Sequence, residues 1–125
     1  MIISVVTDMT TQLKATTREE IRVKAKLFRG LADPSRLSIL ETLREGPKNV
    51  SQIVAATGLS QSNTSMHLNC LWCCGLVDKE VRGRFSYFWI KSRRFVRILE
   101  AVENALHEVY DRVAECARYE EPPKP

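Results

Sequence analysis

Two short helical segments joined by a tight glycine-containing turn constrain the fold of this sequence most strongly. Within VSQIVAATGLSQSNTSMHLNCLWCCG, the pattern predicts a helix over about 51–57 that ends at Gly58. It predicts a second helix that Ser60 caps and that runs to about Cys74, with Gly75 as its left-handed terminator. Two helices with this spacing are typical of a helix-turn-helix, whose second helix enters the major groove of DNA.

The segment that follows the second helix alternates apolar and polar residues, as strands do. LVDKEV and RFSYFWI flank the basic turn RGR, so the sequence predicts a β-hairpin at this point. A helix-turn-helix followed by a hairpin with a basic tip is a winged helix. We therefore expect a mainly α fold with a β-hairpin wing, a winged helix-turn-helix.

Two further helices are predicted before this unit. Thr16 or Thr17, followed three residues later by a glutamate, is a capping-box pattern that opens a helix ending near Phe28. In DPSRLSILETLREG, Asp33 caps the next helix and Pro34 occupies its first turn. The expected inward positions of this second helix are Leu37, Leu40 and Leu43.

Apolar residues recur at helical spacing after Ser92 and predict a long final helix. The stripe consists of Phe95, Ile98, Leu99, Val102, Leu106, Val109 and Val113. So small a domain has too little core to cover this stripe, and we therefore expect a homodimer through the N- and C-terminal helices. The expected organisation is a flexible N-terminal arm over 1–15, a winged-helix DNA-binding and dimerisation domain over 16–118, and a flexible tail over 119–125.

The composition is that of one globular domain. Of the 125 residues, 44% are hydrophobic and 27% are charged. No apolar run approaches the roughly 18 residues that a membrane span needs, and the start MIISVVTDMTTQ lacks the features of a signal peptide. We expect a cytoplasmic protein without membrane contact, whose four cysteines are thiols rather than disulfides. The sequence offers neither a nucleophile with a base partner nor a phosphate-cradling glycine loop, so we do not expect an enzyme.

The charges are segregated along the chain. Residues 79–97 include seven basic residues and one acidic residue, whereas 98–121 include two basic and seven acidic residues. The basic segment suits the phosphates of double-stranded DNA, which Arg82 and Arg84 on the wing would meet with help from Lys79. The second helix of the pair carries no formal charge, and its hydrogen-bonding side chains suit base edges. The residues that we expect to read bases are Gln61, Ser62, Asn63, Ser65 and His67.

The segments LADPSRLSILETL, VSQIVAATGLSQSNTSMHLNCL and GLVDKEVRGRFSYFWI resemble the ArsR/SmtB family of dimeric winged-helix repressors. The resemblance extends over roughly residues 25–116. It implies a repressor that binds operator DNA as a dimer and leaves it when a metal or metalloid binds. Transcription of efflux or detoxification genes would then be released.

The resemblance also indicates which cysteines would bind the metal ion. Some arsenic and cadmium sensors of the family carry cysteines in the segment that corresponds to GPKNVSQIV, where this chain has none. The zinc sensors use two pairs of ligands, and in this chain only His107 lies near the position of one of those ligands. Cys70 and Cys74 in the second helix, with Cys116 near the end, are instead similar to the cadmium- and lead-sensing branch. Cys73 is an addition to that pattern.

The spacing of the cysteines suits a shared ion. Cys70 and Cys74 lie about 40° apart around a helix and one turn from each other, so their side chains can converge. Cys116 would supply a third thiolate from the same protomer or from the other one. Three thiolates favour Cd(II), Pb(II) or As(III), and Zn(II) fits if a nitrogen or water is added. Cys73 could share an ion with Cys70, and His67 is a candidate fourth ligand.

Two other interpretations of the cysteines stay open. The thiols could form a redox or persulfide sensor in a winged-helix repressor without metal, or they could be small buried apolar side chains. The sequence thus predicts a metal-responsive repressor that releases operator DNA, with a thiol switch as the alternative function.

Overall fold

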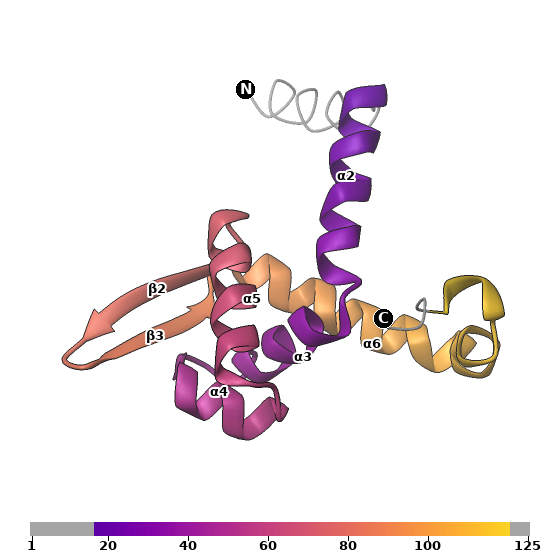
Figure 1. The fold of residues 1–125 in the computed structure, drawn as a ribbon. Coiled ribbons are helices and arrows are strands. Elements are labelled where there is room, and N and C mark those ends of the chain that lie inside the picture. Colours follow the sequence, from indigo (N-terminus) through magenta and orange to yellow (C-terminus); the bar gives the residue numbers. More distant parts are fainter. Residues whose placement is uncertain (1–16, 121–125) are drawn as a thin grey trace.

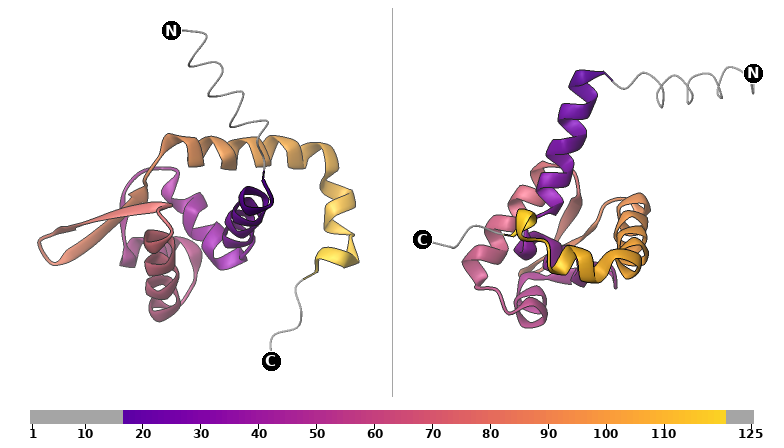
Figure 2. Two further views of the ribbon diagram at one scale, coloured as in Figure 1. Left: turned by 90° about the horizontal axis from the view of Figure 1, so that it is seen from above. Right: turned by 90° about the vertical axis from the view of Figure 1, so that its right-hand side faces the viewer.

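The computed structural model describes residues 17–120 and has the expected winged helix-turn-helix architecture (Figure 1). Its elements are α2 (Arg18–Leu31), α3 (Pro34–Leu43), β1 (Lys48–Asn49), α4 (Val50–Thr57), α5 (Gln61–Cys73), β2 (Val77–Arg82), β3 (Phe85–Ile90), α6 (Arg93–Ala114) and a 3-10 helix (Ala117–Tyr119). Helices α3, α4 and α5 pack together, and the β2–β3 hairpin extends away from them as the wing (Figures 1 and 2). The expected N-terminal arm, and residues 121–125 of the tail, lie outside the described residues.

The helix starts agree with the capping patterns in the sequence. Thr17 and Glu20 form the reciprocal capping box of α2. Asp33 accepts a hydrogen bond of 2.9 Å from the backbone N–H of Arg36 at the start of α3. Ser60 accepts one of 3.1 Å from the N–H of Asn63 at the start of α5. Local hydrogen bonding therefore fixes where these helices begin.

The first helix is longer than the sequence pattern indicates. It continues to Leu31 rather than ending near Phe28, since a side chain from the next helix satisfies its last carbonyls. The Arg36 guanidinium donates to the carbonyl oxygen of Gly30 at 2.7 Å and to that of Arg29 at 3.3 Å. These bonds also tie the end of α2 to the first turn of α3.

The core lies where α3, α4 and α5 meet the base of the wing. Its buried side chains are Ile39, Leu40, Leu43, Ile53, Leu68, Leu71, Leu76, Val77, Phe88 and Leu99. The expectation that Leu37 faces inward is wrong, because this side chain is 37% exposed. The buried side of α3 is centred near Leu43 and includes Ile39 instead, which leaves Leu37 on the flank of the helix.

The wing is the expected hairpin with one added short strand. The sheet order is β1-β3-β2, and the hairpin register runs from Val77 opposite Ile90 to Arg82 opposite Phe85. At the tip Gly83 has a φ of 63°, a left-handed value that glycine adopts without strain. Strand β1 was not expected, because two residues are too few to show an alternating pattern.

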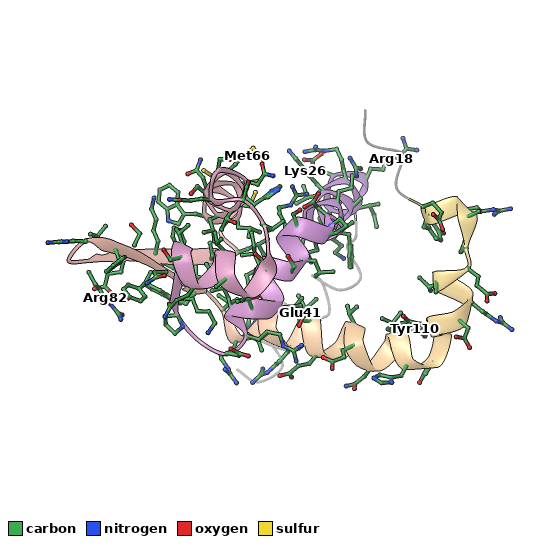
Figure 3. All side chains as sticks on the ribbon, turned by 60° about the horizontal axis from the view of Figure 1, so that its bottom comes forward. Arg18, Lys26, Glu41, Met66, Arg82 and Tyr110 are labelled. Atoms are coloured by element: carbon green, nitrogen blue, oxygen red, sulfur yellow. The ribbon has the colours of Figure 1, made fainter. Side chains whose placement is uncertain are left out.

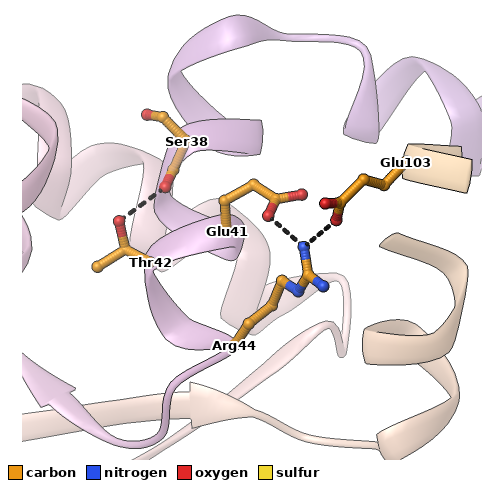
Figure 4. Close-up of polar contacts among 5 residues, drawn as sticks. All are labelled: Ser38, Glu41, Thr42, Arg44 and Glu103. Carbon is orange, nitrogen blue, oxygen red and sulfur yellow. Dashed lines mark hydrogen bonds and ion pairs between the residues drawn. The ribbon is translucent and has the colours of Figure 1, made fainter. Parts of the chain in front are cut away.

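An arginine at the end of α3 forms an ion pair with helix α6 (Figure 4). Arg44 pairs with Glu41 at 2.7 Å on its own helix and with Glu103 on α6 at 2.9 Å. Only Val96 and Leu99 of α6 are buried, so the rest of this 22-residue helix adds little to the core. Among the described residues, none of the helices is long and apolar enough to cross a membrane.

Candidate nucleic-acid interface and thiol site

Helix α5 turns one face into the core and presents the opposite, uncharged face to solvent. Thr64, Leu68 and Leu71 are buried and fix the orientation of the helix. The expected base-reading residues Gln61, Ser62, Asn63 and Ser65 are all exposed. The arrangement suits hydrogen bonding to base edges, since no charged side chain on this helix directs it to phosphates instead.

His67 lies differently from the other expected base-reading residues. It is half-buried, on the side of α5 that is turned toward the start of α3. The backbone N–H of Arg36, with smaller contributions from the charges of Arg36 and His67, holds the pKa of the Asp33 carboxyl below its ordinary value. His67 therefore lies close enough to the start of α3 to act electrostatically on Asp33.

The wing holds its two arginines in different environments. Arg82 pairs with Glu80 at 3.1 Å, and its guanidinium lies 5.2 Å from the centroid of the Tyr87 ring. Arg84 occupies the turn, is exposed, and forms no ion pair with any described residue. Figure 3 shows Arg82 on the hairpin, well away from Met66 on α5. Arg84 is therefore the more available of the two for a phosphate.

Lys79, which we expected to help bind phosphates, contacts an aromatic ring. Its ammonium nitrogen lies 4.1 Å from the centroid of the Trp72 ring, on the last turn of α5. This cation–π contact links the wing to the recognition helix. The sequence analysis missed Trp72, although its position three residues before the helix-terminating Gly75 could have indicated contact with the hairpin that follows.

The three clustered cysteines, Cys70, Cys73 and Cys74, are free thiols and are exposed. Cys74 caps the end of α5, and its N–H donates to the carbonyl oxygen of Cys70 at 3.0 Å, so the helical spacing persists to that residue. Loss of water around the thiol, and then the adjacent Cys70 thiol, raise the pKa of Cys74, while Arg36 acts in the opposite direction. Cys70 and Cys74 are thus neighbours, as their spacing indicates.

Cys116 lies apart from this pair within the protomer. It follows α6, is half-buried, and its N–H donates to the carbonyl oxygen of Val113 at 3.1 Å. Within residues 17–120, no three His, Cys, Asp or Glu side chains converge closely enough to hold a metal ion. His107 is exposed on α6. One protomer therefore offers an adjacent pair of thiols rather than a complete three-thiolate site.

The outer helices expose the apolar faces expected of a dimer. Large apolar side chains that are exposed on α2 and α6 are Ile21, Val23, Leu27, Phe28, Val102, Val109, Tyr110 and Val113. Between α2, α3 and α6 runs an apolar groove of about 580 Å³, to which Phe28, Leu37 and Val102 contribute. Contiguous apolar surface of this kind marks interaction sites.

Known proteins resemble the chain in sequence. Residues 33–79 match the family described as bacterial regulatory protein, arsR family. Over 75 residues the chain is 41% identical to the HTH-type transcriptional regulator CmtR of Mycobacterium tuberculosis, covering 60% of this chain and 64% of that protein. Over 60 residues it is 40% identical to the probable mercury resistance operon repressor of Streptomyces lividans, covering 48% of each. The chain thus spans less than two thirds of these two relatives.

Solved structures resemble the fold over a larger share of the chain. The crystal structure of Rv0081 of Mycobacterium tuberculosis aligns with a TM-score of 0.71 at 30% identity, covering 78% of this chain and 99% of that one. The homodimeric winged helix-turn-helix DNA-binding domain Mb0332 of Mycobacterium bovis aligns with a TM-score of 0.64 at 29% identity, covering 73% and 86%. On these matches, the chain belongs to the arsR family of bacterial regulatory proteins.

Proposed function

We propose that this chain is a dimeric transcriptional repressor that binds operator DNA and leaves it when a thiophilic metal ion binds cysteine thiolates. The observation that carries the proposal is the adjacent pair of thiols, Cys70 and Cys74, on the flank of the helix that reads DNA. The sensed ion is Cd(II) or Pb(II), with As(III) or Zn(II) as further candidates.

DNA binding rests on complementary features of α5 and the wing. The exposed polar side chains of Gln61, Ser62, Asn63 and Ser65 read base edges, whereas Arg84 at the wing tip meets a phosphate. Lys79 on the wing contacts the Trp72 ring at the end of α5. A dimer built on α2 and α6 would set two such units against the two half-sites of a palindromic operator.

Metal binding rests on the chemistry of the donors. Two neighbouring thiols select soft ions, and the similarity to a probable mercury resistance operon repressor supports metal sensing within this group of relatives. A third thiolate would come from the partner subunit's Cys116, because no third donor approaches the pair within the described residues of one protomer. Cys73, which faces the same side as Ser62 and Asn69, is not required for such a site.

Release follows if the metal-bound and DNA-bound dimers differ in shape. An ion that joins the end of α5 to the partner subunit's Cys116 would fix the dimer in one arrangement of its two recognition helices. Operator DNA would select another arrangement. Each ligand then weakens the binding of the other by the same factor, as linkage requires.

The metal site is tested by titrating Cd(II), Pb(II), As(III) and Zn(II) into single serine variants while following thiolate-to-metal absorption. Cys70→Ser, Cys74→Ser and Cys116→Ser should each lose tight binding, because each removes one of three thiolates. Cys73→Ser is the matched control and should keep most of the affinity. A silent Cys74→Ser together with an inactive Cys73→Ser would contradict the assignment.

A redox or persulfide switch is the alternative function, and the exposure of Cys70, Cys73 and Cys74 is the observation that favours it. Burial raises the pKa of Cys74, and reactive cysteines are those whose pKa is lowered, so within this alternative Cys74 is not the thiol that reacts first. Release of DNA by peroxide or polysulfide, with a complex that withstands all four metal ions, would support this alternative and exclude metal sensing.

A further inference from the structure

Met66 is a large apolar side chain on the exposed face of α5. It lies in α5 and is 59% exposed, opposite the buried Leu68 and Leu71. The exposed residues one turn away on the same face include Ser62, Asn69 and Cys70. Figure 3 shows Met66 projecting outward from the helix.

Packing among residues 17–120 does not account for this side chain. The exposed apolar faces suited to a dimer are on α2 and α6, whereas Met66 belongs to the face of α5 that carries the base-reading residues. Toward the start of the helix its neighbours one turn away, Ser62 and Asn63, are polar and exposed, and toward the end they are Asn69 and the exposed thiol of Cys70. A single exposed apolar residue is common on protein surfaces, but this one stands where a recognition helix meets base edges.

The chemistry of the major groove offers one apolar partner there. Among the groups on base edges, the C5-methyl of thymine is apolar, and apolar side chains contact it in sequence readout. Methionine is unbranched and polarisable, so it can adapt to a methyl group without strict geometry. It carries no charge that would draw it to a phosphate.

We infer that Met66 contacts a thymine methyl group in each operator half-site and so helps to determine which sequence the protein binds. The inference rests on the proposed DNA binding and adds a specific base to it. Because the dimer is expected to be two-fold symmetric, two thymines at symmetric positions should be read in the same way.

The test uses an operator selected by the full-length chain from random double-stranded DNA. Each thymine in turn is replaced by deoxyuridine, which removes only the C5-methyl, and binding is measured by fluorescence anisotropy at fixed salt. At one thymine in each half-site, the wild-type protein should lose about fourfold in affinity, the value expected for burying one methyl group.

Two variants test whether Met66 itself makes the contact with the thymine methyl group. Met66→Ala should bind thymine and deoxyuridine operators equally at that position, while Met66→Leu, which keeps an apolar side chain, should still prefer thymine. Both should melt like the wild type, because Met66 is not in the core.

Three outcomes would overturn the inference or its basis. Wild-type binding that is insensitive to every deoxyuridine substitution would exclude the contact. A preference for thymine that persists in Met66→Ala would assign the contact to another residue. Failure of the full-length chain to select any sequence would contradict the proposed DNA binding itself, which separates the two failures.

Discussion

The spacing of residues along the chain predicts which side chains one helix brings together, but not which side chains meet when the helices pack. Cys70 and Cys74 are neighbours because four residues make about one helical turn, and that much follows from sequence. The position of Cys116 depends on where α6 ends and on what packs against it. Spacing along the chain cannot give this position, and among the described residues Cys116 does not join Cys70 and Cys74 in a three-ligand group.

Asp33 gives a residue-scale prediction that depends on pH. Its folded pKa is below the ordinary value of 3.8, so the carboxylate stabilises the fold above that pH and the contribution is lost as pH falls through the folded pKa. Asp33→Ala should lower the free energy of unfolding by about 1 kcal/mol at pH 7, as loss of an N-cap does. Urea denaturation should show a smaller difference near pH 2.

Asp33→Asn is the matched control, because it keeps an oxygen that can accept the hydrogen bond from the N–H of Arg36 but does not titrate. Its free energy of unfolding at pH 7 should lie between those of Asp33→Ala and the wild type, and its difference from Asp33→Ala should not change between pH 7 and pH 2. A deficit in Asp33→Ala that is as large at pH 2 as at pH 7 would show that the ionised cap does not supply the stabilisation.

At the scale of elements, the sequence predicts those whose ends are defined by local hydrogen bonds. The starts of α2, α3 and α5, and the turn at Gly83, follow from short-range chemistry and agree with the structure. The extension of α2 to Leu31 depends on Arg36 of another helix, and the burial of Ile39 rather than Leu37 depends on the directions from which α4 and α5 approach. These are tertiary effects that local patterns do not contain.

The contact between the wing and α5 gives an element-scale prediction. A cation–π pair at an exposed site contributes about 0.5–1 kcal/mol. The double-mutant cycle of Trp72→Leu and Lys79→Met should therefore show a coupling of this size in the free energy of unfolding, measured in urea at fixed protein concentration.

The control is a second double-mutant cycle, in which Lys26, an exposed lysine on α2, takes the place of Lys79. Trp72→Leu and Lys26→Met should be additive. If the cycle with Lys79 is additive as well, the wing is not held to α5 by this contact, although the ammonium lies 4.1 Å from the ring centroid.

At the scale of the whole molecule, the apolar faces of α2 and α6 exceed what the core of one protomer covers. We expect a dimer of about twice the chain mass of 14.3 kDa in sedimentation experiments. Val102→Glu, which places a charge at the groove between α2, α3 and α6, should shift the protein to monomer because a buried unpaired charge is costly.

Val81→Glu is the matched control for this prediction. Val81 is 71% exposed on the wing, and Val102 is 53% exposed on α6, so neither change disturbs the core of a protomer. The wing variant should remain a dimer. A wild-type monomer, or a Val102→Glu variant that sediments with the wild type, would remove α6 from the interface.

The central claim is that metal binding to the thiols releases DNA. The direct measurement is fluorescence anisotropy of a labelled operator complex during addition of Cd(II) or Pb(II), comparing the wild-type protein with Cys70→Ser and Cys73→Ser. We predict that stoichiometric metal releases DNA from the wild type and from Cys73→Ser, whereas the Cys70→Ser complex persists. Equal release from all three proteins, or a wild-type complex that persists with metal bound, would contradict the account.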